Sequence, residues 1–162
     1  MLAATDWIVL LAVASRWIHI LTIALVVGGT FFMRQVLFPA VSATFAEEAH
    51  GRLREAVRQR WSKVIHLGVA LILMTGFFNF YVAIAVDGRT GVYHMIFGVK
   101  FLAALALMFI AIALPSRGEA FAPFRANARM WMGVNIALAA LIILLSSILK
   151  NADRLLPGSA QG

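Results

Sequence analysis

His19 and Lys100 are the two side chains of this sequence whose chemistry is most informative, because packing alone does not explain an ionisable group at either position. Each lies inside a long apolar stretch, at a depth where an ionisable group costs free energy unless a partner or a function compensates for it. An imidazole in this setting can bind haem iron or copper, and an amine can act as a neutral ligand, a base or the partner of an anion. Together they predict a redox or metal site within a membrane.

Lys100 needs a compensating anion that the apolar stretches do not supply, since none of them contains Asp or Glu. A haem propionate, a lipid phosphate, a substrate or another subunit could supply it. A b-type haem would meet this need, with His19 as one axial ligand and either His94 or neutral Lys100 as the other. Arg16 or Lys100 would then face a propionate.

Copper is the alternative metal, because imidazole and thioether groups bind it and Met95 adjoins His94. A third possibility is an accessory subunit of a larger membrane complex, without chemistry of its own, in which Lys100 pairs with a neighbouring chain. Purely structural roles stay open as well, with His19 as a hydrogen-bonded bundle residue and Lys100 reaching the outer membrane edge. The absence of cysteine excludes thiolate metal sites, iron–sulfur clusters and covalent c-type haem.

Two further polar residues, Asn79 and Ser146, are expected at the depth of His19 and Lys100. At a rise of about 1.5 Å per residue, His19 lies roughly 22 Å and Asn79 roughly 24 Å from the cytoplasmic edge, and the other two fall at a similar height. The sequence thus predicts one polar layer in the outer half of the membrane. The candidate cofactor-binding residues are His19, Lys100, His94, Arg16, Asn79 and Ser146, with His19 and His94 as candidate metal ligands.

Four apolar stretches must position this layer, and they define the class of the protein. The 162 residues are 62% hydrophobic and 13% charged, with a mean hydropathy of +0.91, so their apolar side chains cannot all be buried in one soluble core. Membrane spans are predicted at about 7–33, 64–86, 95–114 and 130–149, all helical because lipid cannot satisfy backbone polar groups. The expected fold is a single all-α transmembrane four-helix domain, followed by a short flexible tail at 157–162.

Helical phase predicts which faces of these spans point inward. One face of the first span holds Ser15, His19, Thr22, Val26 and Thr30. One face of the second holds Gly68, Thr75, Gly76 and Asn79, and His66 points the opposite way. The third span places Phe97, Ala104, Leu107 and Ala111 with Lys100, and the fourth aligns Asn135, Ala139, Ile142 and Ser146.

Basic residues predict the orientation. Nine of them fall in the two links that join spans one to two and three to four, namely Arg34, Arg52, Arg54, Arg58, Arg60, Lys63, Arg117, Arg125 and Arg129. The positive-inside rule therefore places these links in the cytoplasm and both termini outside it, in a cell inner (plasma) membrane. The net charge of +7 is concentrated at membrane edges, which indicates contact with the lipid bilayer and not with nucleic acid.

The links have their own signals. Residues 41–59 predict a cytoplasmic amphipathic helix that runs into the second span, because charged residues recur there at i, i+3 and i, i+4. Pro39 is expected to mark the end of the first span. Asp87, Gly88 and Gly91 predict a short external turn, and Pro115 and Pro123 bracket the second cytoplasmic link.

Two short motifs resemble a known family. The first span reads Arg16-Trp17-Ile18-His19, followed by Gly28-Gly29, Phe31, Arg34 and Leu37-Phe38-Pro39, and the third reads Phe97-Gly98-Val99-Lys100-Phe101-Leu102. These motifs resemble the CopD-like (copper resistance D) membrane proteins. The four-span outline is also similar to the membrane protoporphyrinogen oxidase of the HemJ type, which implies haem b and a functional pair, His19 and Lys100. That oxidase has a further His after the first-span glycine, where this chain reads Met33 to Pro39, so the resemblance implies the haem more directly than the reaction.

The sequence thus predicts an integral membrane redox protein that binds haem b in the outer half of its bundle. Its role would be electron transfer or the oxidation of a membrane-soluble reductant. Expected partners are a redox partner, other membrane subunits or further copies of the same chain.

Overall fold

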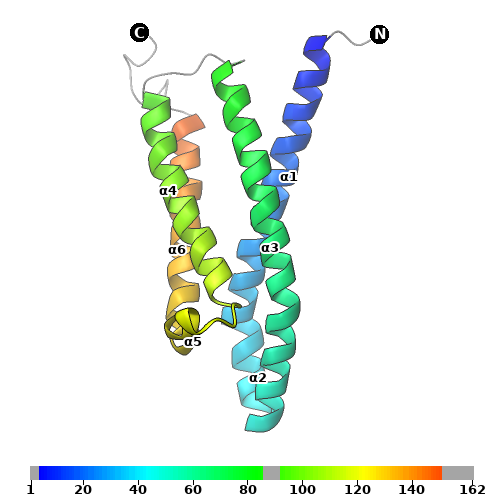
Figure 1. Ribbon diagram of the computed structural model, residues 1–162, viewed down its shortest axis with the longest axis vertical. Coiled ribbons are helices and arrows are strands. Elements are labelled where there is room, and N and C mark those ends of the chain that lie inside the picture. Colours follow the sequence, from blue (N-terminus) through cyan, green and yellow to red (C-terminus); the bar gives the residue numbers. More distant parts are fainter. Residues whose placement is uncertain (1–3, 86–91, 151–162) are drawn as a thin grey trace.

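The chain folds into long helices that run side by side (Figure 1). The computed structural model describes residues 4–85 and 92–150, and all regular structure in these ranges is helical. The elements in chain order are α1 Ala4–Phe32, η1 Met33–Leu37, α2 Phe38–Thr44, α3 Glu47–Ala85, α4 Val92–Ala113, η2 Glu119–Phe121, α5 Ala122–Ala126 and α6 Ala128–Lys150. The predicted external turn around Asp87 and the predicted tail at 157–162 lie outside the described residues.

Four helical stretches of the described chain are long and apolar enough to cross a membrane: Trp7–Thr44, Glu47–Ala85, His94–Ala113 and Ala128–Ile148. Their outer surface is apolar as well, since Leu25, Met74 and Leu102 are 61%, 70% and 67% exposed. Such side chains are stable facing lipid and would form a large apolar patch in water. These features identify a multi-pass membrane protein, as the composition predicted.

The first helix does not stop at Pro39. It widens into the π-turn η1, in which the Phe38 backbone N–H bonds the Met33 carbonyl, and then continues as α2 to Thr44. Proline has no N–H, and its ring would clash with the carbonyl four residues earlier in a regular α-helix. A π-turn directly before the proline relieves this clash and lets the helix continue.

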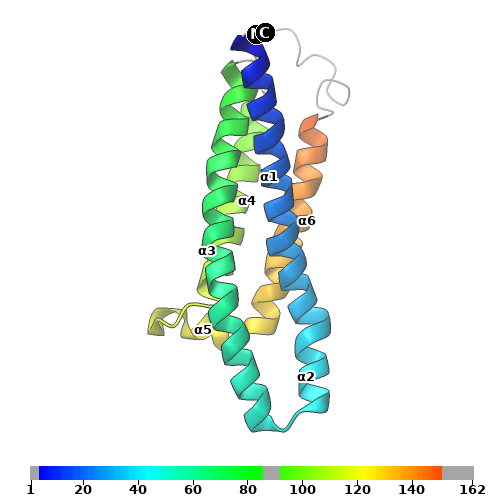
Figure 2. The same ribbon diagram turned by 90° about the vertical axis from the view of Figure 1, so that its right-hand side faces the viewer.

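The second long helix, α3, begins at Glu47 and not near residue 41, and it continues without a break into the second apolar stretch. Residues 41–44 belong to α2, and Phe45 then takes an extended backbone conformation before α3 begins. At about 1.5 Å per residue α3 is roughly twice as long as a hydrocarbon core is thick. Its charged first part, residues 47–63, therefore projects beyond the apolar part. We call the end of the bundle that holds residues 34–63 and 114–129 the basic end (Figures 1 and 2).

Glycines bring α1 and α3 into close contact. A Cβ atom at Gly68 would lie 2.7 Å from Val26, and one at Gly76 would lie 3.2 Å from the His19 ring. At Gly29, a Cβ atom would lie only 2.2 Å from the Trp61 ring. Small residues let helix backbones approach in membranes, where packing replaces the hydrophobic effect as a driving force. The faces predicted for the first two spans are thus the faces that meet.

The other long helices pair as α4 with α6, and aromatic rings join α4 to α3. Asn135 of α6 is 2% exposed and donates from Nδ2 to the Leu107 carbonyl of α4 at 2.9 Å. Phe80 of α3 stacks on Phe97 of α4, with ring centroids 3.8 Å apart. In Figure 2 the last turns of α6, coloured orange, lie away from α3. The result is two helix pairs, α1 with α3 and α4 with α6.

Candidate functional site

His19 is held between α1 and α3 by a hydroxyl group. Its Nδ1 lies 2.8 Å from Thr75 Oγ1, and its ring packs over Gly76, where the missing side chain leaves room for it. Ser15, one turn earlier on α1, donates to the Thr75 carbonyl at 3.4 Å. The imidazole is therefore fixed in position by α3 at the level of Thr75.

The hydrogen bonds of Thr75 determine which nitrogen of His19 carries the proton. Thr75 has one O–H, and it donates to the Leu71 carbonyl at 2.6 Å. Its oxygen can then only accept from His19, so the His19 Nδ1 carries the hydrogen. In a neutral imidazole the lone pair then belongs to Nε2, which is the arrangement found in histidines that bind metals through this nitrogen.

One cation lies near this imidazole, and a second cation lies near the first. Lys100 of α4 is half-buried and interacts electrostatically with His19, and Arg16 of α1 interacts electrostatically with Lys100. Two positive charges at one place repel each other and favour binding of an anion. The glutamates whose side chains the structure describes, Glu47, Glu48, Glu55 and Glu119, all belong to the basic end or its link and not to this region.

The structure brings the six predicted site residues together only in part. His19, Lys100 and Arg16 form one electrostatic group. The Ser146 hydroxyl donates to the Ile142 carbonyl of its own helix at 2.7 Å, and Asn79 is half-buried without a hydrogen bond to the described part of the chain. No described hydrogen bond joins either of them to His19.

His94 lies near the start of α4, and its exposed ring meets the Phe80 ring edge-on at 6.1 Å. Its neighbour Met95 is 68% exposed. The described side chains form no group of three His, Cys, Asp or Glu that could hold a metal ion. A haem needs only one or two iron ligands from the protein, and a single imidazole such as that of His19 fits that smaller requirement.

Sequence reasoning did not identify Thr75 as the partner of His19. The signal was present, because Thr75 shares a face with Gly76 and lies one turn before Asn79. It also missed a second group at the basic end, where Arg54, Arg58, Trp61 and Ile65 repeat at spacings of four, three and four residues. That spacing places all four on one face of α3.

At the basic end Glu55 is the centre of an ion-pair network. Arg58 binds it with two hydrogen bonds of 2.7 and 2.6 Å, Gln59 donates at 2.9 Å and Arg117 at 2.8 Å. These bonds, that of Arg58 above all, lower the pKa of Glu55 to about 2. Arg58 also donates to the Pro115 carbonyl at 2.7 Å, so the network ties α3 to the link after α4.

Comparisons of the chain with protein-family models, with curated proteins and with solved structures found no match.

Proposed function

We propose that the protein is a membrane redox protein in which His19 would bind the iron of a b-type haem. The observation that supports this proposal is the hydrogen bond from His19 Nδ1 to Thr75, which leaves Nε2 as a ligand. A histidine that binds a metal usually has a hydrogen-bond partner at its other ring nitrogen. This partner fixes the orientation of the ring and raises the basicity of the ligating nitrogen. When bound, haem would supply one-electron transfer.

Lys100 and Arg16 would hold the propionates, or a neutral Lys100 would be the second ligand of the iron. Their mutual repulsion is relieved by an anionic group, and a propionate would be one. The stacked rings of Phe80 and Phe97 would shield the site from water between α3 and α4. These roles agree with the proposed membership in the CopD-like family, which rests on the motifs around His19 and Lys100.

The absorption spectrum of the purified protein tests this proposal. We expect a Soret band that shifts on reduction and is lost in His19→Ala. His66→Ala is the matched control, because His66 is exposed and bonds the Ser62 carbonyl of its own helix at 2.6 Å. Thr75→Val should weaken haem retention about 10- to 100-fold, as loss of such supporting hydrogen bonds usually does.

Other outcomes of this experiment decide between the remaining functions. A colourless preparation with stoichiometric copper would favour a copper-handling protein. A preparation with neither metal nor porphyrin, in which Lys100→Met disturbs only assembly with a partner, would favour an accessory subunit. A Soret band that persists in His19→Ala would refute His19 as the ligand.

We also propose that the basic end faces the cytoplasm of a cell whose inner membrane holds the protein, with both termini on the other side. The cations of this end support that orientation through the positive-inside rule. Because the chain has no cysteine, a single cysteine can report on each side. Thr44→Cys should react with an impermeant thiol reagent only in inverted vesicles, and Arg89→Cys only in intact cells.

A further inference from the structure

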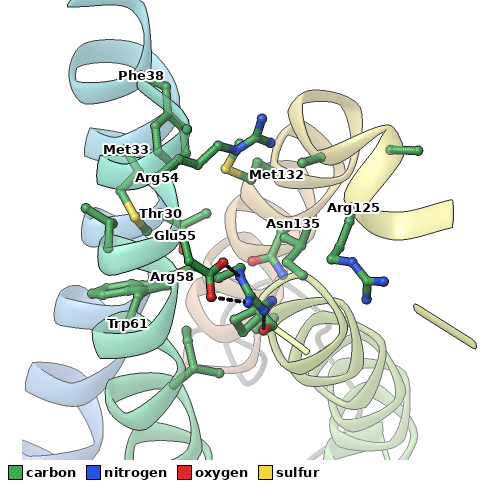
Figure 3. A pocket seen from close by; sticks show the side chains of 18 residues that line it. Thr30, Met33, Phe38, Arg54, Glu55, Arg58, Trp61, Arg125, Met132 and Asn135 are labelled. Carbon is green, nitrogen blue, oxygen red and sulfur yellow. Dashed lines mark hydrogen bonds and ion pairs between the residues drawn. The ribbon is translucent and has the colours of Figure 1, made fainter. Parts of the chain in front are cut away.

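A cavity of about 440 Å³ opens at the basic end (Figure 3), and His19 is not among the residues that line it. Its walls come from every part of the bundle that meets there: α1 with η1 and α2, the charged part of α3, the end of α4, α5 and the start of α6. The volume lies in the range of sites that bind small molecules. Nothing in the proposed redox function uses it.

The inner wall of this cavity is apolar and well buried. Met33 of η1 and Met132 of α6 are both 7% exposed, Ile65 is 1% exposed, and the Trp61 ring forms part of the same wall. Methionine side chains adapt to irregular apolar ligands, and an indole ring offers a flat apolar surface. This part of the cavity suits a hydrocarbon chain.

The mouth of the cavity is positive. Arg54, Arg58 and Arg125 line it together with the single carboxylate Glu55. Glu55 is already bound by Arg58 and, from outside the lining, by Arg117, so its charge is balanced.

Two mouth arginines keep their charge without a carboxylate among the described residues. The Arg54 guanidinium lies over the Phe38 ring at 5.7 Å, and Figure 3 shows it extending from α3 toward Met132 of α6. Arg125 donates from Nη1 to the carbonyls of Ser116 and Gly118, which are neutral. A guanidinium over an aromatic ring keeps its edge free to bind phosphate or carboxylate oxygens.

Asn135 adds a polar side chain to the wall of the cavity. It is 2% exposed, and Nδ2 is used in the bond to Leu107, whereas Oδ1 accepts no hydrogen bond from the described residues. The described residues include no fully buried side-chain oxygen without a partner, so this oxygen is not closed off, and Asn135 is one of the residues that line the cavity. An unpartnered amide oxygen of a side chain this buried is costly unless a bound molecule or water donates to it.

From these features we infer that the cavity binds an anionic amphiphile, with its phosphate or carboxylate head at Arg54 and Arg125 and its hydrocarbon chain against Met33, Trp61 and Met132. A basic cavity between helices at a membrane edge is where anionic lipid head groups bind. The same chemistry is offered by a phospholipid of the bilayer and by a free single-chain amphiphile. This site is independent of the proposed haem.

Retention of defined lipids by the delipidated, detergent-purified protein, measured by native mass spectrometry, tests the proposal. Dioleoyl phosphatidylglycerol should bind at least tenfold more tightly than dioleoyl phosphatidylcholine. Arg54→Gln should weaken phosphatidylglycerol binding about fivefold, the usual effect of one basic residue near a membrane surface. Arg52→Gln and Arg60→Gln are matched controls, because both are exposed cations of α3 that do not line the cavity.

Gly51→Leu tests the cavity without removing a charge. Gly51 lines the mouth, and a Cβ atom there meets nothing within 4 Å, so the variant should fold and block the entrance. Gly28→Leu, equally free of contacts and away from the cavity, is its control. We expect loss of phosphatidylglycerol retention in the first variant and none in the second.

Dodecyl phosphate identifies the source of the ligand. If it binds and displaces phosphatidylglycerol, the site accepts free single-chain amphiphiles; if it does not, the site is specific for phospholipid, and either result supports the proposal. Equal retention of phosphatidylcholine, or equal effects of Arg54→Gln and Arg52→Gln, would overturn it. Retention unchanged by Gly51→Leu would overturn it as well, because binding would then lie outside the cavity.

Discussion

The close approach of α1 and α3 at Gly29 allows a sharp test of the packing. A Cβ atom at Gly29 would lie 2.2 Å from Trp61 Cη2 and 3.0 Å from Cζ2 and Cζ3. Ordinary van der Waals contact begins near 3.4 Å, so the ring would have to move by about 1.2 Å, which is 3.4 minus 2.2. The atoms in question belong to a rigid ring and not to the end of a flexible side chain, so Gly29→Ala must displace the whole indole or the helix.

Gly28 is the matched control for this substitution. It lies next to Gly29 on α1, yet a Cβ atom there meets nothing within 4 Å. Replacing glycine by alanine within a helix stabilises it by about 1 kcal/mol, and both variants gain this contribution. Overpacking costs about 1–3 kcal/mol, and only Gly29→Ala incurs it. The free energy of unfolding of Gly29→Ala should therefore be about 1–3 kcal/mol lower than that of Gly28→Ala.

Reversible unfolding in mixed micelles, followed by circular dichroism, measures this difference. Trp61→Phe provides a second test, because phenylalanine lacks the Cη2 atom that makes the closest contact. In the Trp61→Phe background, Gly29→Ala should lose most of its cost, so the two substitutions should be coupled by about 1 kcal/mol or more. Equal stability of the two alanine variants, or a cost that persists without the indole, would refute the packing described between α1 and α3.

Two further predictions concern the basic end and the α4–α6 pair. Because Arg58 and its neighbours hold the pKa of Glu55 at about 2, the stabilisation from Glu55 is complete above its ordinary pKa of 4.5 and is lost as the pH falls toward 2. The free energy of unfolding should thus fall less between pH 4.5 and 2 in Glu55→Gln than in the unmodified protein. If the acid unfolding curve is the same in both, Glu55 does not stabilise the protein through this network. Asn135→Ala should lower the free energy of unfolding by about 1–2 kcal/mol, because it removes the bond to Leu107 and leaves a small void. Ser146→Ala, whose hydroxyl bonds only its own helix, should stay within about 0.5 kcal/mol, and equal effects of both would count against this role of Asn135.

The helices and their contact faces were predictable because lipid imposes a simple pattern. Apolar stretches of sufficient length must be helical there, and small or hydroxyl residues at helical spacing mark the faces that meet. Gly68, Thr75 and Gly76 of α3 do face α1, and His66 does point away. Periodicity within one helix contains this information, so no knowledge of the partner helix is needed.

The grouping of the site residues was harder to predict, because the depth of a residue in the membrane does not determine which neighbouring helix its side chain faces. Equal height along the membrane normal placed Ser146 with His19, although its hydroxyl bonds its own helix. Which helices are neighbours depends on packing between elements far apart in the sequence, here α1 with α3 and α4 with α6. The tautomer of His19 likewise depends on a hydroxyl 56 residues away and on where that hydroxyl donates its own proton.

Pro39 shows how one residue can shape a cavity that it does not line. In a regular α-helix, residues 33 and 38 are five positions and therefore about 140° apart around the axis, so they cannot face the same space. The π-turn bonds residue i to residue i+5 and brings the two nearly into line, and both Met33 and Phe38 line the cavity at the basic end. Phe38 in turn supports the Arg54 guanidinium at 5.7 Å. The clash that proline would cause in an α-helix thus accounts for both the apolar wall at Met33 and the placement of a charge at the mouth.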